Sequence, residues 1–447
     1  MCRRFLLRLA AVVGAAVLAL ALVTAQPAAI ATATAAAGAG GAASADNANA
    51  TATAATASAP CSSVATCYTP RQLETAYGVT PLLNQGTDGR GRTVVLPELA
   101  VQPGAAPAVS DVRQDLELFD TTFGLPAADV QVDAGLADTG TPWLANQEEV
   151  QDVEIVHAIA PGAALRIVLL PSTALSSTAT ATAGLTAALW RGMAEGDVIS
   201  VSAGWGEHCL TSAEVASMHQ ALRAAAARGV TVVAASGDTG AVSRPCLGST
   251  GPWDPVKEVN MPAADPFVLA AGGTTLTADH QSGTHISETA FSDPAASRGS
   301  GGGFSTLFPR PAYQDGVPGA GTARAVPDVA ADADAVTGMA VVVDDGNGQS
   351  TVFGGEGTSA SAPLWAGVVA LADQCAGRDL GLVDPAIYAI GSGPAYRFAF
   401  HDVTTGTNTV VISSVTIPGY AAGPGWDPVT GWGSPDAAVL VPLLSRV

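Results

Sequence analysis

Short apolar runs recur along the chain between longer stretches that have helical periodicity. The short runs are rich in β-branched residues and apolar along their whole length, as is typical of strands buried on both faces. They predict strands at residues 93–96, 130–132, 164–170, 198–202, 231–235 and 267–271. Between them, the spacing of apolar positions predicts helices at residues 146–159, 182–194 and 213–228.

This alternation of strands and helices predicts an α/β fold with a doubly wound parallel sheet that helices cover on both faces. No internal repeat and no linker-like stretch divides residues 61–447. With 48% apolar residues, the chain can bury a large core. We therefore expect a single domain from Cys61 to the C-terminus.

The first 60 residues differ in composition from the rest. Arg3, Arg4 and Arg8 precede an apolar run at residues 9–23, and residues 23–25 offer a small-residue cleavage site, so residues 1–25 are predicted to be an export signal. The Arg3–Arg4 pair leaves open whether export follows the general or the twin-arginine route. Residues 26–60 are rich in Ala and Thr and poor in large apolar groups, which predicts a low-complexity spacer.

The charge balance excludes some classes of partner. The chain has 39 acidic and 19 basic residues, and removal of the predicted signal leaves 16 basic residues and a net charge of −23. Nucleic acids bind basic surfaces, and anionic lipids repel an acidic chain, so neither is an expected partner. No run beyond the signal is long and apolar enough to span a membrane. We expect a secreted, extracellular monomer.

Five of the six cysteines remain after removal of the signal, and export exposes them to oxidising conditions. We predict one disulfide between Cys61 and Cys67 and another between Cys209 and Cys246. Cys375 is then left over. Because it continues a predicted helical stripe, we expect it to pack in the core.

Candidate chemistry begins with residues 357–363, GTSASAP, which precede an apolar run at residues 364–374. Small residues permit a tight turn, and Pro363 is expected in the first helical turn, where a missing N–H costs least. Leu364, Val368 and Leu371 then recur at helical spacing. Ser359 would lie at the positive end of the helix dipole, which favours a nucleophile; the alternative is that it is an ordinary N-cap.

A second stretch begins at residue 146 and reads NQEEVQDVEIVHAIAPGA. Glu148 and Asp152 are four residues apart, so their carboxyl groups share one helix face, and like charges that close raise one pKa. The ordinary alternative is a solvated acidic face, but the apolar residues that follow predict a buried helix. His157 lies roughly 140° to 180° away from these carboxylates, so we expect a packed or hydrogen-bonded histidine and not the base of a Ser-His-Asp triad.

Asp238 follows the predicted strand at residues 231–235, at the position where doubly wound sheets bind ligands. It belongs to the second of two Asp-Thr-Gly triplets, at residues 138–140 and 238–240, which aspartic proteases also contain. The first triplet follows a loop-like stretch, and the parallel α/β pattern does not match the all-β fold of that class. The sequence therefore argues against an aspartic protease.

Taken in order, several motifs resemble the sedolisin family, the serine-carboxyl peptidases with a subtilisin-like fold. Each motif is weak alone, but together they are specific and cover nearly all of the chain from about Cys61 onward. The motifs are TPRQLETAYGV from Thr69, the Glu148-to-Asp152 spacing before AIAPGA, AASGDTG, VNMPAADPFVLAAGGTTL from Val259, SGGGFSTLFPRPAYQ from Ser300, VPDVAAD from Val326, GTSASAP, and GPGWDPVTGWGSP.

The resemblance implies a serine-type endopeptidase that acts on polypeptides. Ser359 would be the nucleophile, Glu148 the general base, Asp152 the group that orients Glu148, and Asp238 the oxyanion residue. A carboxylate base and a protonated Asp238 suit acid conditions, so we expect a pH optimum of roughly 3 to 5, set by reference carboxyl pKa values near 4. Trp205 is expected either to line the cleft or to pack.

The resemblance also implies one structural Ca²⁺ ion. The C-terminal stretches AFHDVTTGTN and YAAGPGWDPVTGWGSP combine carboxylates with glycine-rich turns, and such all-oxygen ligation suits calcium. The implied ligands are the carboxylates of Asp402 and Asp427 and the backbone carbonyls of Val403, Gly423 and Gly425.

The N-terminal region departs from the family pattern. Members of the family usually carry a large prodomain, whereas 35 low-complexity residues lie here between the predicted signal and the peptidase domain. This departure leaves one alternative function, a catalytically silent exported binding module on the same fold. The complete set of Ser359, Glu148, Asp152 and Asp238 favours the peptidase.

Overall fold

The computed structural model describes residues 67–99, 111–136, 147–171, 173–344 and 350–446. The predicted signal, the predicted spacer, Cys61 and the first Asp-Thr-Gly triplet lie outside these residues. All described residues belong to one compact unit. No helix among them is long and apolar enough to cross a membrane.

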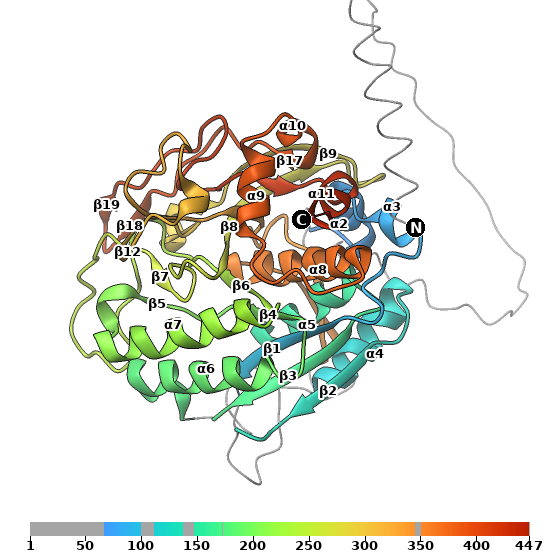
Figure 1. Ribbon diagram of the computed structural model, residues 1–447, viewed down its shortest axis with the longest axis horizontal. Helices are drawn as coiled ribbons and strands as arrows, with labels where there is room; N and C mark the ends of the chain where they lie inside the picture. The colour runs from blue at the N-terminus through green and yellow to red at the C-terminus, as the bar shows by residue number, and fades with distance from the viewer. Residues whose placement is uncertain (1–66, 100–110, 137–146, 172, 345–349, 447) are drawn as a thin grey trace, which may run out of the picture. The chain divides into compact units, whose positions relative to one another are not determined.

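A parallel sheet of seven strands forms the centre of the fold (Figure 1). All six pairings between these seven neighbours are parallel, and an eighth strand, β9 (His285–Ala290), pairs antiparallel with β8. The order across the sheet is β14 (Val329–Asp332), β8 (Leu269–Ala278), β6 (Thr231–Ala235), β4 (Val198–Val201), β1 (Thr93–Leu99), β3 (Ala164–Leu170) and β2 (Asp129–Asp133).

Helices cover both faces of this sheet. On one side lie α5 (Gln147–Ile159) and the central α8 (Thr358–Ala376); on the other lie α6 (Thr178–Gly192) and α7 (Ser212–Ala227) (Figure 1). Alternate strand residues feed two separate cores: Val94 and Leu96 pack with the α8 side, and Val95 packs with the α6 side. A strand with both faces buried is apolar throughout, which explains the sequence pattern.

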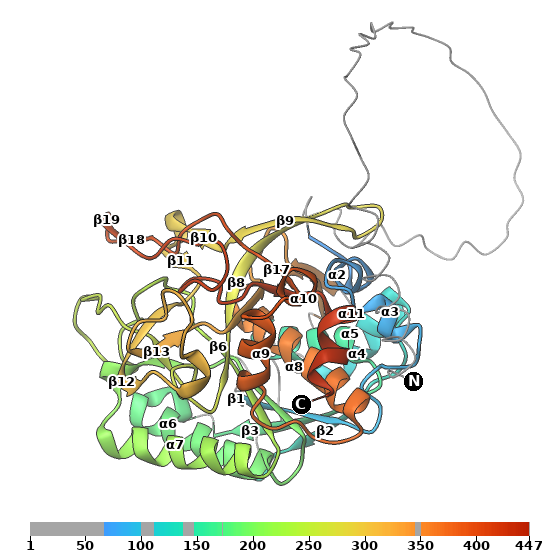
Figure 2. The same ribbon diagram turned by 45° about the horizontal axis from the view of Figure 1, so that its top comes forward.

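Smaller elements surround the sheet. The remaining helices are α2 (Pro70–Ala76), α3 (Thr80–Leu83), α4 (Val112–Phe123), α9 (Asp384–Gly391), α10 (Tyr396–Ala399) and α11 (Ala437–Leu444). The antiparallel pairs are β5 (Trp205–Gly206) with β7 (Asn260–Met261), β10 (Ser292–Asp293) with β11 (Arg298–Gly299), β12 (Gly303–Pro309) with β13 (Ala323–Val326), β15 (Ala340–Asp344) with β16 (Ser350–Gly354), β17 (Phe400–His401) with β20 (Ser434–Pro435), and β18 (Val410–Ile412) with β19 (Val415–Ile417). Figure 2 shows β18 and β19 beside β10 and β11, at the end of the molecule away from α11.

The predicted fold class is confirmed: the sheet is mainly parallel and doubly wound. All six predicted strands and all three predicted helices are present, with ends that shift by up to seven residues. The largest strand change is in β8, which continues to Ala278 because its second half pairs with β9. The edge strand β14 was not predicted, because its four residues form too short an apolar run to stand out.

The cysteines agree only in part with the prediction. Cys209 and Cys246 form the predicted disulfide, with their Cα atoms 5.4 Å apart. Cys375 is disulfide-bonded, so the expectation that it only packs in the core was wrong. It lies in the last turn of α8, where it is only partly buried. Cys67 is also disulfide-bonded, but its predicted partner, Cys61, lies outside the described residues.

Because the fold buries carboxyl groups, we expect it to be more stable in acid than at neutral pH. Burial raises the pKa of Glu74, on α2, from 4.5 to about 7. Below pH 4.5 this residue is protonated in both states, whereas between pH 4.5 and 7 only the unfolded chain ionises, so stability falls as the pH rises. We expect Glu74→Gln to stabilise the protein by about 3 kcal/mol at pH 8 and by nothing at pH 4, measured by denaturant unfolding. Glu117→Gln, at an exposed position, is the control; an equal gain from both variants would contradict the prediction.

Candidate active site

The predicted catalytic residues come together at the carboxyl edge of the sheet. Asp238 follows β6, and Ser359 is the second residue of α8, the helix that packs along β4, β6 and β8. Glu148 and Asp152 lie in the first two turns of α5, which packs against α8. A doubly wound sheet binds ligands at this edge, so the topology places all four side chains where a substrate can reach them.

The turn before α8 differs from the prediction in two ways. The N-cap is Gly357, at φ 78° and without a side-chain cap, so the reading of Ser359 as an ordinary cap is wrong. The helix begins at Thr358, which puts Pro363 inside it and not in its first turn. Because proline has no N–H, the carbonyl of Ser359 loses its usual helical partner, and the Ser202 hydroxyl oxygen lies 3.4 Å from it.

Asp238 takes over the capping of this helix from another part of the chain. Its Oδ1 accepts hydrogen bonds from the backbone N–H of Thr358 at 2.7 Å and from the Thr358 hydroxyl at 2.9 Å. A Cβ atom at position 357 would lie 2.7 Å from Oδ2 of Asp238, so only glycine allows this approach. These bonds fix Asp238 beside Ser359 through one oxygen and leave Oδ2 without a hydrogen bond among the described residues.

Glu148 lies beside the nucleophile. The Ser359 hydroxyl is placed to donate a hydrogen bond to the Glu148 carboxylate. Although Glu148 is exposed to the cleft, the protein atoms around its carboxyl group remove enough water to raise its pKa to about 7. The Ser359 hydrogen bond opposes this rise, while the charge of Asp238 adds to it. A carboxylate with a raised pKa that accepts from a serine is the arrangement expected of a general base.

Asp152 continues the chain of carboxyl groups into the interior. It is fully buried, and burial together with the charge of Glu148 raises its pKa well above the usual range. Its side chain is hydrogen-bonded to Glu98, whose own pKa burial also raises strongly. Two carboxyl groups can bond in this way only if one of them carries a proton. Burial of both groups therefore favours the protonated form of at least one of them.

Glu98 and Ser202 are the site residues that the sequence prediction missed. Glu98 lies near the end of β1 and is 6% exposed, while Ser202 follows β4 and donates a hydrogen bond to Oδ2 of Asp152. The predicted first strand ended at Leu96, so Glu98 fell just outside it. A carboxylate two residues beyond an apolar strand was the available signal.

His157 takes no part in the site, as its helical phase predicted. It is completely buried, and its Nε2 lies 2.9 Å from the Pro126 carbonyl oxygen and 2.9 Å from a carboxylate oxygen of Asp120. Glu149, the residue next to Glu148, is likewise buried. A Ser-His-Asp triad is therefore excluded for Ser359 and His157.

Trp205 lines the cleft, the first of its two expected roles. It belongs to the walls of two cavities that share Ser202, one extending past Asp238 and the other past Glu148. The cavity on the Glu148 side is largely apolar, with Leu99, Leu170, Leu175 and Leu185 among its lining residues. A chain that crosses Ser359 would thus place side chains on both sides of the nucleophile.

The residues implied as calcium ligands also lie together. The Gly425 N–H donates to the Asp402 carboxylate at 3.1 Å, and the Gly423 N–H donates to Asp427 at 3.1 Å. Asp427 also accepts from the N–H groups of Val429 and Thr430 at 2.8 and 2.9 Å. Within the described residues, neither aspartate forms an ion pair with a basic side chain. Two neighbouring carboxylates without a counter-charge, beside a glycine loop, fit a hard cation.

Comparison with known proteins agrees with this geometry. Residues 138–380 match the model of the subtilase family. Kumamolisin from Bacillus sp. (strain MN-32) is 36% identical over 394 residues, which cover 86% of this chain and 64% of that protein. Sedolisin from Pseudomonas sp. (strain 101) is 31% identical over 346 residues, which cover 74% and 55% of the two chains. The chain thus spans less than two thirds of the length of either relative.

A solved structure shows the same arrangement of the chain. It is Pseudomonas sedolisin, a serine-carboxyl proteinase, complexed with two molecules of pseudo-iodotyrostatin. The match has a TM-score of 0.67 and 27% sequence identity, and it covers 84% of this chain and 97% of that one. The family model covers more than half of the chain, and both relatives and the solved structure agree with it. The chain therefore belongs to the subtilase family and, within it, to the sedolisins.

Proposed function

We propose that this chain is a secreted serine-carboxyl endopeptidase that acts in acid through an acyl-enzyme on Ser359. The observation that carries the proposal is the placement of the Ser359 hydroxyl beside Glu148, backed by the buried pair of Asp152 and Glu98. The hydroxyl has a base within reach, and that base has a third group behind it that can orient it, as is typical of an activated serine nucleophile.

The reaction follows from these positions. Oγ of Ser359 attacks the peptide carbonyl carbon while Glu148 accepts the hydroxyl proton, and the carbonyl oxygen becomes an oxyanion. A protonated Asp238, held through Oδ1, donates from Oδ2 to that oxygen. Glu148 then gives its proton to the leaving amine, the C–N bond breaks, and an ester to Ser359 remains. Water, deprotonated by Glu148, hydrolyses this ester and regenerates the hydroxyl.

The pH dependence follows from two opposite requirements. Asp238 must be protonated to donate a hydrogen bond, so activity is lost once it ionises. Glu148 must be ionised to accept a proton, so activity also falls as the pH drops below its pKa. Because that pKa is raised to about 7, the fall in activity on the acid side of the profile begins at a higher pH. We expect a maximum near the upper end of the range from about pH 3 to 5.

Hydrolysis of an unfolded protein substrate between pH 3 and 8 tests the proposal. Products are identified by mass spectrometry, and internal cleavage sites distinguish an endopeptidase from an enzyme that trims chain ends. We expect internal cleavage with a maximum in acid. A maximum at neutral pH or above would contradict the carboxylate mechanism. No cleavage at any pH would favour the catalytically silent binding module.

Secretion is proposed from the predicted signal at residues 1–25 and from the disulfide between Cys209 and Cys246. Expression of the full chain in a bacterial host that exports through the same signals tests it. The protein should accumulate outside the cytoplasm with a new N-terminus near residue 26. Retention of the uncleaved chain in the cytoplasm would argue against secretion.

We also propose that one Ca²⁺ ion stabilises the C-terminal loop. Asp402 and Asp427 would supply carboxylates, and Val403, Gly423 and Gly425 would supply backbone carbonyls. The ion would neutralise two neighbouring acids and hold residues 423–427 against the strand pair β17 and β20; it would take no part in catalysis.

Removal of calcium should lower the thermal stability. With free calcium at 100 times its Kd, binding contributes about 2.7 kcal/mol of stability, which a chelator would remove. For a domain of this size we expect a fall in Tm of several degrees, measured by calorimetry. Asp402→Asn should lower Tm and make it insensitive to chelation, with Asp254→Asn as the exposed control. An unchanged Tm on chelation would contradict the site.

A further inference from the structure

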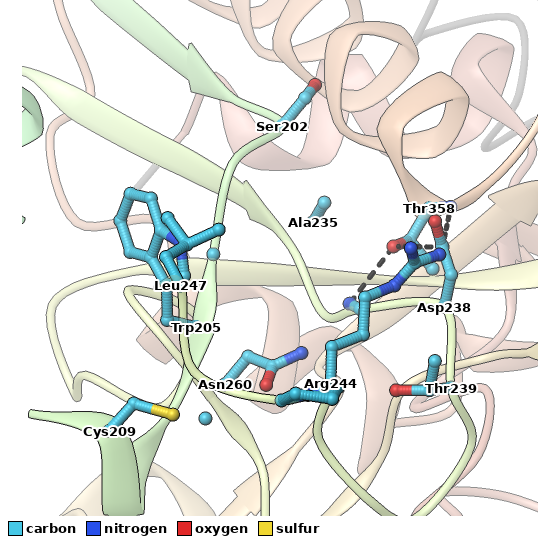
Figure 3. A pocket seen from close by; sticks show the side chains of 14 residues that line it. Ser202, Trp205, Cys209, Ala235, Asp238, Thr239, Arg244, Leu247, Asn260 and Thr358 are labelled. Carbon is cyan, nitrogen blue, oxygen red and sulfur yellow. Dashed lines mark hydrogen bonds between the residues drawn. The ribbon is translucent and has the colours of Figure 1, made fainter. Parts of the chain in front are cut away.

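The cavity on the Asp238 side of the cleft is built differently from the one on the Glu148 side. It has a volume of about 190 Å³, which is enough for a long side chain. Trp205, Arg244 and Asn260 line it together with Asp238 and Thr358 (Figure 3). Arg244 is the single basic side chain in its lining, whereas the lining of the other cavity contains none.

Arg244 has no partner in the part of the chain that the structure describes. It is exposed, and neither a hydrogen bond nor an ion pair engages its guanidinium group. Other arginines near the site are neutralised: Arg298 lies 2.6 Å from Glu356, and the buried Arg324 is paired with Asp328. In a chain with more than twice as many acidic as basic residues, an unpaired arginine in the substrate cleft is unexpected.

The backbone on either side of Arg244 is anchored, which holds the Cα atom of Arg244 in place. The buried Ser243 donates its hydroxyl hydrogen to Glu258. Cys246 is tied to Cys209 by the disulfide, and the Leu247 N–H donates to the Thr178 hydroxyl at 3.0 Å. Figure 3 shows the Arg244 side chain extending from this segment toward Asp238 and Thr358.

The position of the cavity beside Asp238 indicates which residue of the substrate would enter it. In the proposed reaction, Asp238 binds the oxygen of the scissile carbonyl. The side chain nearest to that oxygen belongs to the residue that contributes the carbonyl, because its Cα is bonded to the carbonyl carbon. A side chain of that residue that enters this cavity meets Arg244 in its lining.

We propose that this cavity selects peptides with a glutamate or aspartate at the residue that contributes the scissile carbonyl, and that Arg244 is the specificity-determining residue. The inference rests on the proposed peptidase function. A guanidinium binds a carboxylate through two parallel hydrogen bonds, and a partly enclosed site strengthens that pair. Asp238 is the one carboxyl group in the lining, and while it is protonated it does not compete for Arg244.

Two peptides that differ only in glutamate or glutamine at this residue test the inference. At pH 5 the substrate glutamate is mostly ionised, and we expect kcat/KM to favour it over glutamine about tenfold. At pH 3 the glutamate is mostly protonated, and the ratio should fall to about one. Arg244→Gln should give a ratio near one at both pH values. Arg223→Gln, which removes an exposed arginine elsewhere, should keep the wild-type ratio.

Failure of the inference and failure of the proposed function give different results. A wild-type ratio near one at pH 5, with both peptides cleaved in a Ser359-dependent manner, would overturn the inference alone. A tenfold ratio that persists in Arg244→Gln would also overturn it, because another group would then be responsible. No Ser359-dependent cleavage of either peptide would overturn the peptidase proposal itself. Arg244→Glu supplies a further check, since it should favour a lysine peptide over the glutamate peptide.

Discussion

Replacing Ser359 with alanine should lower peptide hydrolysis at pH 4 by about 10⁴- to 10⁶-fold, the range that loss of a serine nucleophile costs in related chemistry. The expected loss is this large because the next serine of the same helix cannot take over. Ser361 is fully buried and lies on α8 two residues beyond Ser359, a turn of about 200° away from it. Initial rates with a peptide that releases a fluorophore measure the effect.

Ser361→Ala is the matched control for this prediction. Its hydroxyl makes no hydrogen bond among the described residues, so its removal should leave both activity and folding intact. Equal losses in the two variants would show that the helix, and not the nucleophile, had been damaged. Full activity in Ser359→Ala would disprove the acyl-enzyme mechanism.

Replacing Glu148 with glutamine should lower kcat by roughly 10³-fold, a typical contribution of general-base catalysis. Glutamine has nearly the same shape and can still accept the Ser359 hydrogen bond, but it cannot accept the proton. The variant should also lose the acid side of the pH profile, because that side reports the ionisation of Glu148. Rates measured from pH 3 to 7 test both expectations.

The stability of the Glu148 variant separates catalysis from folding. Burial raises the pKa of Glu148 to about 7, so its ionisation near neutral pH works against the folded state. Glu148→Gln should therefore have a Tm at pH 7 equal to or above that of the wild type, together with its low activity. Glu117→Gln, at an exposed site, should change neither quantity. Activity close to wild type in Glu148→Gln would show that another group is the base.

The sheet could be predicted because burial on both faces leaves a simple signature. Strands such as β3 and β6 are apolar at nearly every position. The peripheral antiparallel pairs were not predicted. In β18 and β19, the paired stretches are only three residues long, so neither forms an apolar run long enough to stand out. Their register depends on partners that the local sequence does not reveal.

The site could be predicted where local spacing sets the geometry, and only there. Glu148 and Asp152 share a helix face, so their proximity follows from the helix alone. Glu98 comes from β1 and meets Asp152 only through the packing of α5 on the sheet. Single-sequence reasoning has no means of pairing residues on separate elements. The resemblance to a family supplied the roles of the four catalytic residues but not this fifth carboxyl group.

The capping of α8 by Asp238 links the nucleophile to completion of the fold. Gly357 has no side chain with which to begin the helix, and the carboxylate that substitutes for it is 120 residues away along the chain. Until β6 has joined the sheet, α8 lacks its N-terminal cap beside Ser359. If the proposed mechanism holds, a partly folded chain lacks the ordered nucleophile that cleavage needs.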